Sequence, residues 1–200
     1  MVNMRPFTAF EQKNLKFLVN HNVKFTIVEI TPTGLGKGIL DSTAPMRAYF
    51  LENGIHNYEE QLQGQEHKQI KQACILTDAT QFFTKASFYR PNTKKGDPRM
   101  WIYGLGAHTD GNDIHVLFWH EQTLYSINIT HIDIEKCYNS ALITPMQEIL
   151  KEINKEGNSV SEELLGRFRA VKDKWFESEV TADTGIGRTI ESFLGISMNS

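Results

Sequence analysis

Hydrophobic positions along the chain predict an N-terminal helix that leads into a strand. Thr8 stands three residues before Glu11, which matches a capping box, and apolar residues then recur at helical spacing to about residue 20. Apolar and polar residues alternate over residues 23–30, a pattern typical of a half-buried strand. Residues 31–38 follow as a predicted loop, whose three glycines allow the backbone to approach a ligand closely.

The middle of the chain predicts a mainly antiparallel sheet. A short helix that reaches Phe50 and is ended by Asn53-Gly54 comes first, and residues 55–72 have only a weak pattern, so we interpret them as a long loop with some helix. Further strands are predicted at residues 73–78, 81–89, 100–103, 114–119 and 123–131. Because many of these strands are neighbours in sequence, we expect an α+β fold with an antiparallel sheet or barrel and flanking helices.

The C-terminal part predicts a helical extension. Apolar residues at helical spacing predict one amphipathic helix from about Met146 and a second after Ser161, with a break at residues 156–158. We therefore place a sheet domain at residues 1–140 and a helical extension at residues 141–180.

Length and composition fit one domain with an appendage. The chain has 200 residues, of which 40% are hydrophobic, and this is enough to build a core. No run of about eighteen apolar residues exists and the N-terminus lacks the apolar centre of a signal peptide, so we expect a cytoplasmic protein that contacts no membrane. The two cysteines, Cys74 and Cys137, each lie in an apolar, strand-like context and are predicted to be reduced core thiols.

The distribution of charge changes this picture. The net charge is −3, which by itself argues against a nucleic-acid-binding protein. Residues 1–100, however, hold 13 Lys and Arg against 9 Asp and Glu, whereas residues 101–200 hold 8 against 15. Residues 85–101 alone hold five basic residues against the single acid Asp97. Local fields decide where a polyanion docks, so this segment is the candidate binding surface.

Residues 85–101 are predicted to form a hairpin with a basic tip. Turn-forming residues fill the middle of the segment, and strand-like residues flank it on both sides. Arg90 and Arg99 flank the tip, where a strand can hold each guanidinium rigidly against phosphate or the O6 and N7 edge of guanine. Duplex DNA is the partner that best fits rigid arginines beside flexible lysines. The alternative is a solvated edge hairpin kept basic to prevent aggregation.

The glycine-rich stretch at residues 31–38 supplies a second candidate surface. Its GLGKG sequence lacks the spacing of a phosphate loop and of a dinucleotide fingerprint, so nucleotide binding is not expected. Together with Lys37, it fits the opposite side of a clamp on DNA, although simple turn glycines remain the alternative. We assign base contacts to Arg90, Asn92, Asp97 and Arg99. We assign contacts to the DNA backbone to Thr33, Lys37, Lys85, Lys94 and Lys95.

Metal-ligating residue types are present, but their spacing does not predict a metal site. Histidines at 108, 115, 120 and 131 accompany Asp110 and Asp113, yet the calcium-loop-like stretch after His108 lacks the glutamate that would complete it. Residues 133–136 hold acids and a lysine in the wrong order for a magnesium-dependent nuclease. No hydrolase or zinc motif is found.

The C-terminal residues resemble a nuclease family. Residues 183–196, DTGIGRTIESFLGI, resemble the opening motif of the MvaI/BcnI restriction endonucleases, which are relatives of the mismatch-repair nuclease MutH. The resemblance implies that residues 181–200 begin a nuclease domain, in which Glu191 supports the metal site. The family's other catalytic residues would follow Ser200, so we expect no catalysis by this chain and a Mg²⁺ cofactor only for a longer parent enzyme.

Residues 20–136 resemble, more loosely, the N-terminal effector domain of EcoRII-type restriction enzymes. That domain is a DNA-binding pseudobarrel of the plant B-three type, which grips the major groove with two arms. The corresponding segments are residues 31–43 and 87–100. The combination of both parts implies a type II effector domain that binds CCWGG, where W is A or T, and whose partners are double-stranded DNA and the nuclease domain of the same chain. We expect the chain to be a monomer.

Two other classes of function remain open from the sequence. The chain could be a complete metal-dependent enzyme that cleaves DNA, with a metal held by Asp110, Asp113 or Asp133. It could also be a protein-interaction module whose basic hairpin contacts an acidic partner. Magnesium-dependent cleavage would distinguish the first of these, and a failure to bind free duplex DNA would distinguish the second.

Overall fold

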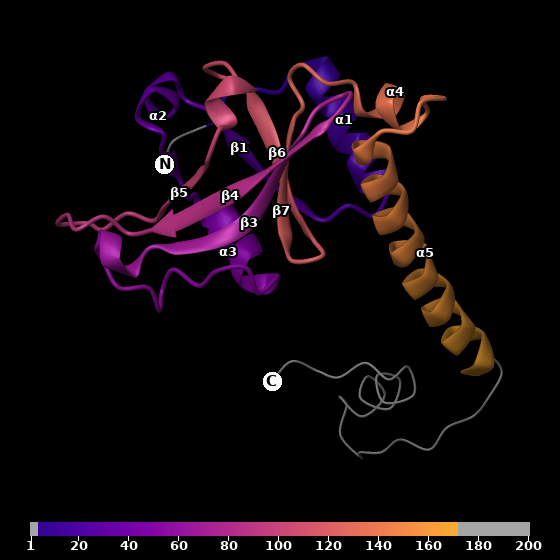
Figure 1. Ribbon diagram of the computed structural model, residues 1–200. Coiled ribbons are helices and arrows are strands. Elements are labelled where there is room, and N and C mark those ends of the chain that lie inside the picture. Colours follow the sequence, from indigo (N-terminus) through magenta and orange to yellow (C-terminus); the bar gives the residue numbers. More distant parts are fainter. Residues whose placement is uncertain (1–3, 172–200) are drawn as a thin grey trace, which may run out of the picture. The chain divides into compact units, whose positions relative to one another are not determined.

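The computed structural model describes residues 4–171 and has an α+β fold (Figure 1). Its strands are β1 (Phe25–Glu29), β2 (Leu40–Asp41), β3 (Gln69–Leu76), β4 (Gln81–Tyr89), β5 (Arg99–Ile102), β6 (Ile114–His120) and β7 (Thr123–Asn128). Its helices are α1 (Ala9–Asn20), α2 (Pro32–Lys37), α3 (Ala44–Glu52), α4 (Ile134–Tyr138) and α5 (Pro145–Val171), with short 3-10 turns η1 (Gln65–His67) and η2 (Leu105–Ala107). The sheet and its covering helices belong to the compact unit Met1–Ile153, and a second unit begins at Asn154.

The strands form one nearly closed, barrel-like sheet in the order β1-β6-β7-β3-β4-β5-β2. Neighbouring strands pair antiparallel except for β3 and β7, which run parallel. The prediction of a mainly antiparallel barrel-like sheet with flanking helices is therefore confirmed. The two-residue strand β2 and the parallel pair were not predicted, because neither leaves a periodic pattern in the sequence.

Hydrophobic side chains pack on both faces of this sheet. One core gathers residues of α3, such as Phe50, against β4 and β5, where Phe88 and Met100 are fully buried. The other core lies under α1, α4 and the first part of α5, and includes Leu18 and Phe118. Successive residues of β3 alternate between the two cores, which explains why residues 73–76 are all buried and form a continuous apolar run.

The N-terminal helix begins at the predicted capping box. The Thr8 side chain accepts from the Glu11 amide, and the Glu11 carboxylate accepts from the Thr8 amide. Arg5 also bonds this carboxylate, which is fully buried and accepts from Thr130 as well. The bond with Arg5 lowers the pKa of Glu11 to about 2, although burial acts in the opposite direction. Because Glu11 also bonds Thr130, which follows β7, the N-terminal cap connects α1 to the end of the sheet.

Two predictions about helices are wrong, and two strand boundaries differ as well: β3 begins at Gln69, inside the predicted loop 55–72, and β7 ends at Asn128 and not at residue 131. Residues 31–38 are not a loop but contain α2, because Thr31 caps the helix, Pro32 occupies its first turn and Gly38 ends it at φ +62°. The predicted break at residues 156–158 is absent, and α5 continues through Gly157. A glycine costs a helix only about 1 kcal/mol relative to alanine, and a long helix without a proline at this point tolerates that cost.

Candidate nucleic-acid interface

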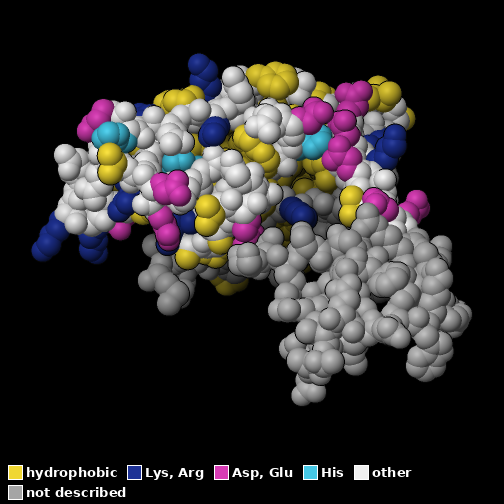
Figure 2. Space-filling model, turned by 90° about the horizontal axis from the view of Figure 1, so that it is seen from below, with side chains coloured by type: hydrophobic (Ala, Val, Ile, Leu, Met, Phe, Trp, Pro, Cys, Tyr) yellow, Lys and Arg dark blue, Asp and Glu magenta, His cyan; other side chains and the backbone are white. Residues whose placement is uncertain are grey.

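The hairpin formed by β4 and β5 carries the most basic segment of the chain. The two strands pair up to Tyr89 opposite Arg99, and residues 90–98 connect them beyond the sheet (Figure 1). The side chains of Lys94 and Lys95 are exposed in this connection. Figure 2 shows Lys and Arg side chains projecting at the left end of the molecule, where Figure 1 places the hairpin. We call residues 87–100 the hairpin arm, whose predicted pairing is confirmed.

Arg90 braces the hairpin arm from inside. Its Nε donates to the carbonyl of Gly96 at 3.0 Å, across the connection. Its Nη1 donates to the carbonyls of Gln61 at 3.2 Å and Tyr58 at 3.4 Å. Two of the three guanidinium nitrogens are therefore engaged with the protein's own backbone. This arrangement assigns Arg90 a structural role, whereas its predicted contact with a base stays a prediction.

Arg99 is placed differently from Arg90. It begins β5 opposite Asp41 of β2, and its Nε lies 3.6 Å from the Asp41 carboxylate. The Arg99 side chain is 30% exposed, and its Nε is buried and makes no hydrogen bond within the described part of the chain. Asp41 is thus an ion-pair partner of Arg99 but not a hydrogen-bond partner. Arginine can bind two acceptors at once.

A second arm, residues 31–43, lies at the base of the hairpin arm. We call it the helical arm, because it consists of α2 and the residues that lead through β2. β2 pairs with β5, and Gly38 approaches the indole ring of Trp101 so closely that a Cβ there would lie 3.5 Å from it. Lys37 is exposed at the end of α2. The structure therefore brings together the two segments singled out in the sequence.

The remaining predicted contact residues lie in two places. Thr33 on the helical arm and Asn92 and Asp97 on the hairpin arm are exposed. Lys85 is also exposed, but it lies four residues before the end of β4, which corresponds to about 13 Å along a strand. The structure thus separates Lys85 from the tip of the hairpin. Glu191 and residues 181–200 lie outside the described residues.

Sequence reasoning missed the residue that joins the two arms, Tyr58, and a second residue that supports the hairpin arm, Gln61. The hydroxyl of Tyr58 donates to the carbonyl of Arg99 at 2.9 Å and bonds the Ser42 hydroxyl at 2.8 Å. The amide of Gln61 donates to the carbonyls of Phe88 and His67. Tyr58 and Gln61 lie within residues 55–72, where apolar and polar positions show neither a helical nor a strand period. An aromatic residue in a polar segment was the only available signal.

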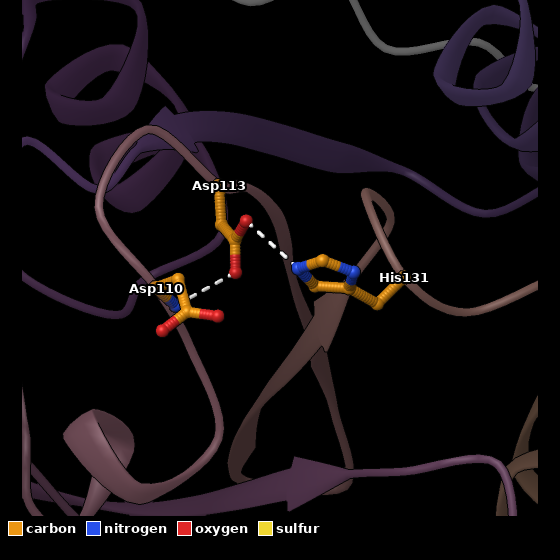
Figure 3. Close-up of side chains that lie close together, drawn as sticks. All are labelled: Asp110, Asp113 and His131. Carbon is orange, nitrogen blue, oxygen red and sulfur yellow. Dashed lines mark hydrogen bonds and ion pairs between the residues drawn. The ribbon is translucent and has the colours of Figure 1, made fainter.

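Asp113 is the centre of a second cluster of chemically active side chains. One of its oxygens accepts from the backbone amide of Asp110 at 2.8 Å, and the other lies 3.0 Å from Nε2 of His131 (Figure 3). The first oxygen also accepts from the side-chain amide of Asn128 at 2.8 Å. Burial disfavours the carboxylate, but the bonds from the Asp110 amide and Asn128 hold the pKa of Asp113 below its ordinary value. The carboxylate is therefore ionised and closely held.

The geometry of this cluster is compatible with a divalent cation. Asp110, Asp113 and His131 each offer one ligand atom, and these atoms lie within 4.8 Å of one another. The chemistry of a mixed carboxylate and imidazole set suits Mn²⁺ or Zn²⁺. Asp113 nevertheless already has four hydrogen-bond partners, which hold the turn at residues 109–113. The bonds explain this arrangement without an ion.

The other predicted metal-ligating residues do not join this cluster. His115 is fully buried, and its ring nitrogens bond Ser126 at 2.9 Å and Thr109 at 3.0 Å. Burial lowers the pKa of His115 to about 4, so the ring is neutral at pH 7. Asp133 caps α4 through the amide of Lys136. Among the described residues, a separate group is formed by His120, Glu121 and Glu152.

No protein-family model, curated protein or solved structure matches this chain. The structure by itself defines the class of protein as an α+β domain with a nearly closed, mostly antiparallel sheet. Two adjacent arms lie at one edge of that sheet, and one of them is strongly basic. Within the described residues, no helix is both long and apolar enough to cross a membrane.

Proposed function

We propose that this chain binds double-stranded DNA sequence-specifically through the hairpin arm and the helical arm. The observation that carries the proposal is the placement of exposed basic side chains on two arms that are joined at their base by β2 and β5. A DNA duplex offers phosphates on both sides of its major groove, which suits two arms better than one. The target proposed from the family resemblance is CCWGG.

The residues of the arms divide into two proposed roles. Arg99 contacts guanine, because its partly exposed side chain lies at the base of the hairpin arm beside Asp41, and a good bidentate pair contributes about 1–3 kcal/mol of discrimination. Asp97 accepts from a cytosine amino group or orients a neighbouring arginine. Lys94 and Lys95 contact phosphates, as does Lys37 on the other arm. These phosphate contacts add affinity without sequence information.

A salt series tests whether DNA binds as proposed. The fluorescence anisotropy of a labelled CCWGG duplex is measured with the 200-residue chain at several salt concentrations without magnesium. We expect the logarithm of the affinity to fall linearly with the logarithm of the salt concentration, with a slope of about −0.9 per phosphate contact. Absence of binding at moderate salt would overturn the proposal and favour an acidic protein as the partner of the hairpin.

We infer that this chain is a binding domain, and we assign no catalysis to it. By resemblance, it acts as the effector or tether of a type II restriction endonuclease, whose Mg²⁺-dependent nuclease domain is its partner. One observation favours a second candidate, a metal-dependent enzyme, because Asp110, Asp113 and His131 lie close enough to hold a cation. Incubation of the chain with duplex DNA and Mg²⁺ or Mn²⁺ separates the two. We expect uncut DNA, whereas cleavage abolished by Asp110→Asn would establish the enzyme.

A further inference from the structure

A buried hydroxyl joins the two arms. Tyr58 is 4% exposed, and its hydroxyl donates to the carbonyl of Arg99, 2.9 Å away. A tyrosine hydroxyl has only one proton, so the second bond, of 2.8 Å to Ser42, has the serine as its donor. Ser42 lies in the helical arm and Arg99 in the hairpin arm. One atom of Tyr58 therefore contacts both.

Other bonds around this hydroxyl fix its partners. The amide of Ser42 donates to the carbonyl of Pro98 at 2.9 Å, and Nη1 of Arg47 donates to the carbonyl of Ser42 at 2.6 Å. The ring of Tyr58 lies edge-on to that of His56, with centroids 4.3 Å apart. Burial raises the pKa of Tyr58 far above its ordinary value, so the hydroxyl keeps its proton at every physiological pH.

We propose that Tyr58 is a positioning residue that sets the spacing and orientation of the two arms, so that both can read the same DNA site. This inference rests on the function proposed above and extends it to a residue that does not touch DNA. The bond from Tyr58 holds the peptide from which the Arg99 side chain projects. Reading groups must be held within about 0.5 Å of their productive geometry, and a buried hydroxyl shared by both arms does this.

Tyr58→Phe tests the proposal, because it keeps the ring and removes only the hydroxyl. Binding of the variant is measured with a CCWGG duplex and with a scrambled duplex of equal length. We expect the preference for CCWGG to fall about tenfold, which corresponds to the loss of roughly one bidentate contact. Affinity for the scrambled duplex should change by less than about twofold, since the phosphate-binding lysines remain.

Tyr49→Phe is the matched control. Tyr49 is also buried, at 8% exposure, and its hydroxyl also makes two bonds, donating to the carbonyl of Lys24 at 3.0 Å and accepting from the amide of Trp119 at 2.9 Å. Those partners belong to the region around β1 and β6 and to neither arm. Both variants lose a buried hydroxyl and should lose similar stability, but only Tyr58→Phe should lose discrimination. Equal retention of discrimination by both variants would overturn the proposal.

Two further measurements keep the test decisive. Ser42→Ala leaves the bond from Tyr58 to Arg99 but removes the bond between the hydroxyls of Ser42 and Tyr58, and should reduce discrimination to a similar extent. The double variant with Tyr58→Phe should lose little more discrimination than either single variant.

Hydrogen exchange at the amide of Ser42, which donates to the carbonyl of Pro98, can be measured without DNA. We expect faster exchange in Tyr58→Phe and not in Tyr49→Phe. Unchanged exchange would refute the coupling of the arms. Failure of the unaltered chain to bind DNA would refute the proposed function, and with it the role of Tyr58 in reading DNA, but it would leave the coupling of the arms standing.

Discussion

The guanidinium of Arg90 donates to the carbonyl of Gly96, 3.0 Å away, and so closes the hairpin arm on itself. The same side chain also bonds the carbonyls of Tyr58 and Gln61. An arginine that sequence alone assigns to a DNA base thus has bonds that shape the arm carrying the other DNA-binding candidates. The two arginines of the hairpin have different surroundings, although both lie at the ends of the same connection.

Arg90→Lys should therefore loosen the hairpin arm. Lysine keeps the positive charge but cannot bond three carbonyls in one plane. We expect the free energy of unfolding to fall by about 1–3 kcal/mol, measured by urea denaturation, because buried carbonyls lose a charged donor. Lys95→Ala, at an exposed position of the same arm, serves as the control and should leave stability nearly unchanged. Equal stabilities of the two variants would contradict the bracing role.

Arg99 and Lys94 should separate sequence reading from phosphate binding. Arg99→Ala should weaken binding to a CCWGG duplex by about 1–3 kcal/mol and affect a scrambled duplex much less. Lys94→Ala should weaken both complexes alike. It should also make the slope of log affinity against log salt concentration shallower by about 0.9, the value for one phosphate contact. Binding isotherms on both duplexes provide the measurement. Equal losses for both variants on both duplexes would contradict the division of roles.

Stability should fall on mild acidification because of His115. Burial lowers the pKa of this ring to about 4, from an ordinary value of 6.5, while the carboxylate of Asp113 opposes the shift and His131 and His108 add to it. Between these two values the unfolded chain binds more protons than the folded chain. The free energy of unfolding should thus decrease as the pH falls from 6.5 towards 4. His115→Gln, which cannot titrate, should flatten this part of the curve measured by urea denaturation.

Asp113 should stabilise the fold through hydrogen bonds and without a metal ion. Asp113→Asn replaces one carboxylate oxygen with an NH2 group, which would face groups that themselves donate hydrogen bonds. We therefore expect a loss of about 1–3 kcal/mol of unfolding free energy. Asp110→Asn changes an exposed carboxylate and should cost less than about 0.5 kcal/mol. Both values should be the same with and without EDTA. A bound cation would instead be revealed if EDTA destabilised the unaltered chain and the substitution Asp110→Asn destabilised it by a similar amount.

Local signals in the sequence predicted the parts of the fold that depend on neighbours in the chain. The capping box of Thr8 and Glu11 marked the start of α1. Alternation and turn residues marked the hairpin of β4 and β5. The glycines of residues 31–38 were misinterpreted because a capping threonine, a proline and a terminal glycine can define a helix of only six residues, which is too short to show a period.

Contacts between distant residues could not be predicted from the sequence. Tyr58 bonds Arg99 across 41 positions, and Arg90 bonds Tyr58 across 32. Such bonds join side chains to backbone carbonyls, and any residue type provides a carbonyl, so they leave no motif. The contacts of Asp113 with Asn128 and His131 depend likewise on the turn that precedes β6 and on the end of β7.

The most direct test of sequence-specific DNA binding compares two duplexes of equal length, one with CCWGG and one with the same bases scrambled. Equilibrium dissociation constants of the purified chain are measured for both at one physiological salt concentration without magnesium. We predict a preference of about 10³-fold or more for CCWGG, the lower end for sequence-specific proteins. Equal affinities for the two duplexes would contradict sequence reading by the two arms, and binding to neither would contradict the assignment of DNA as the partner.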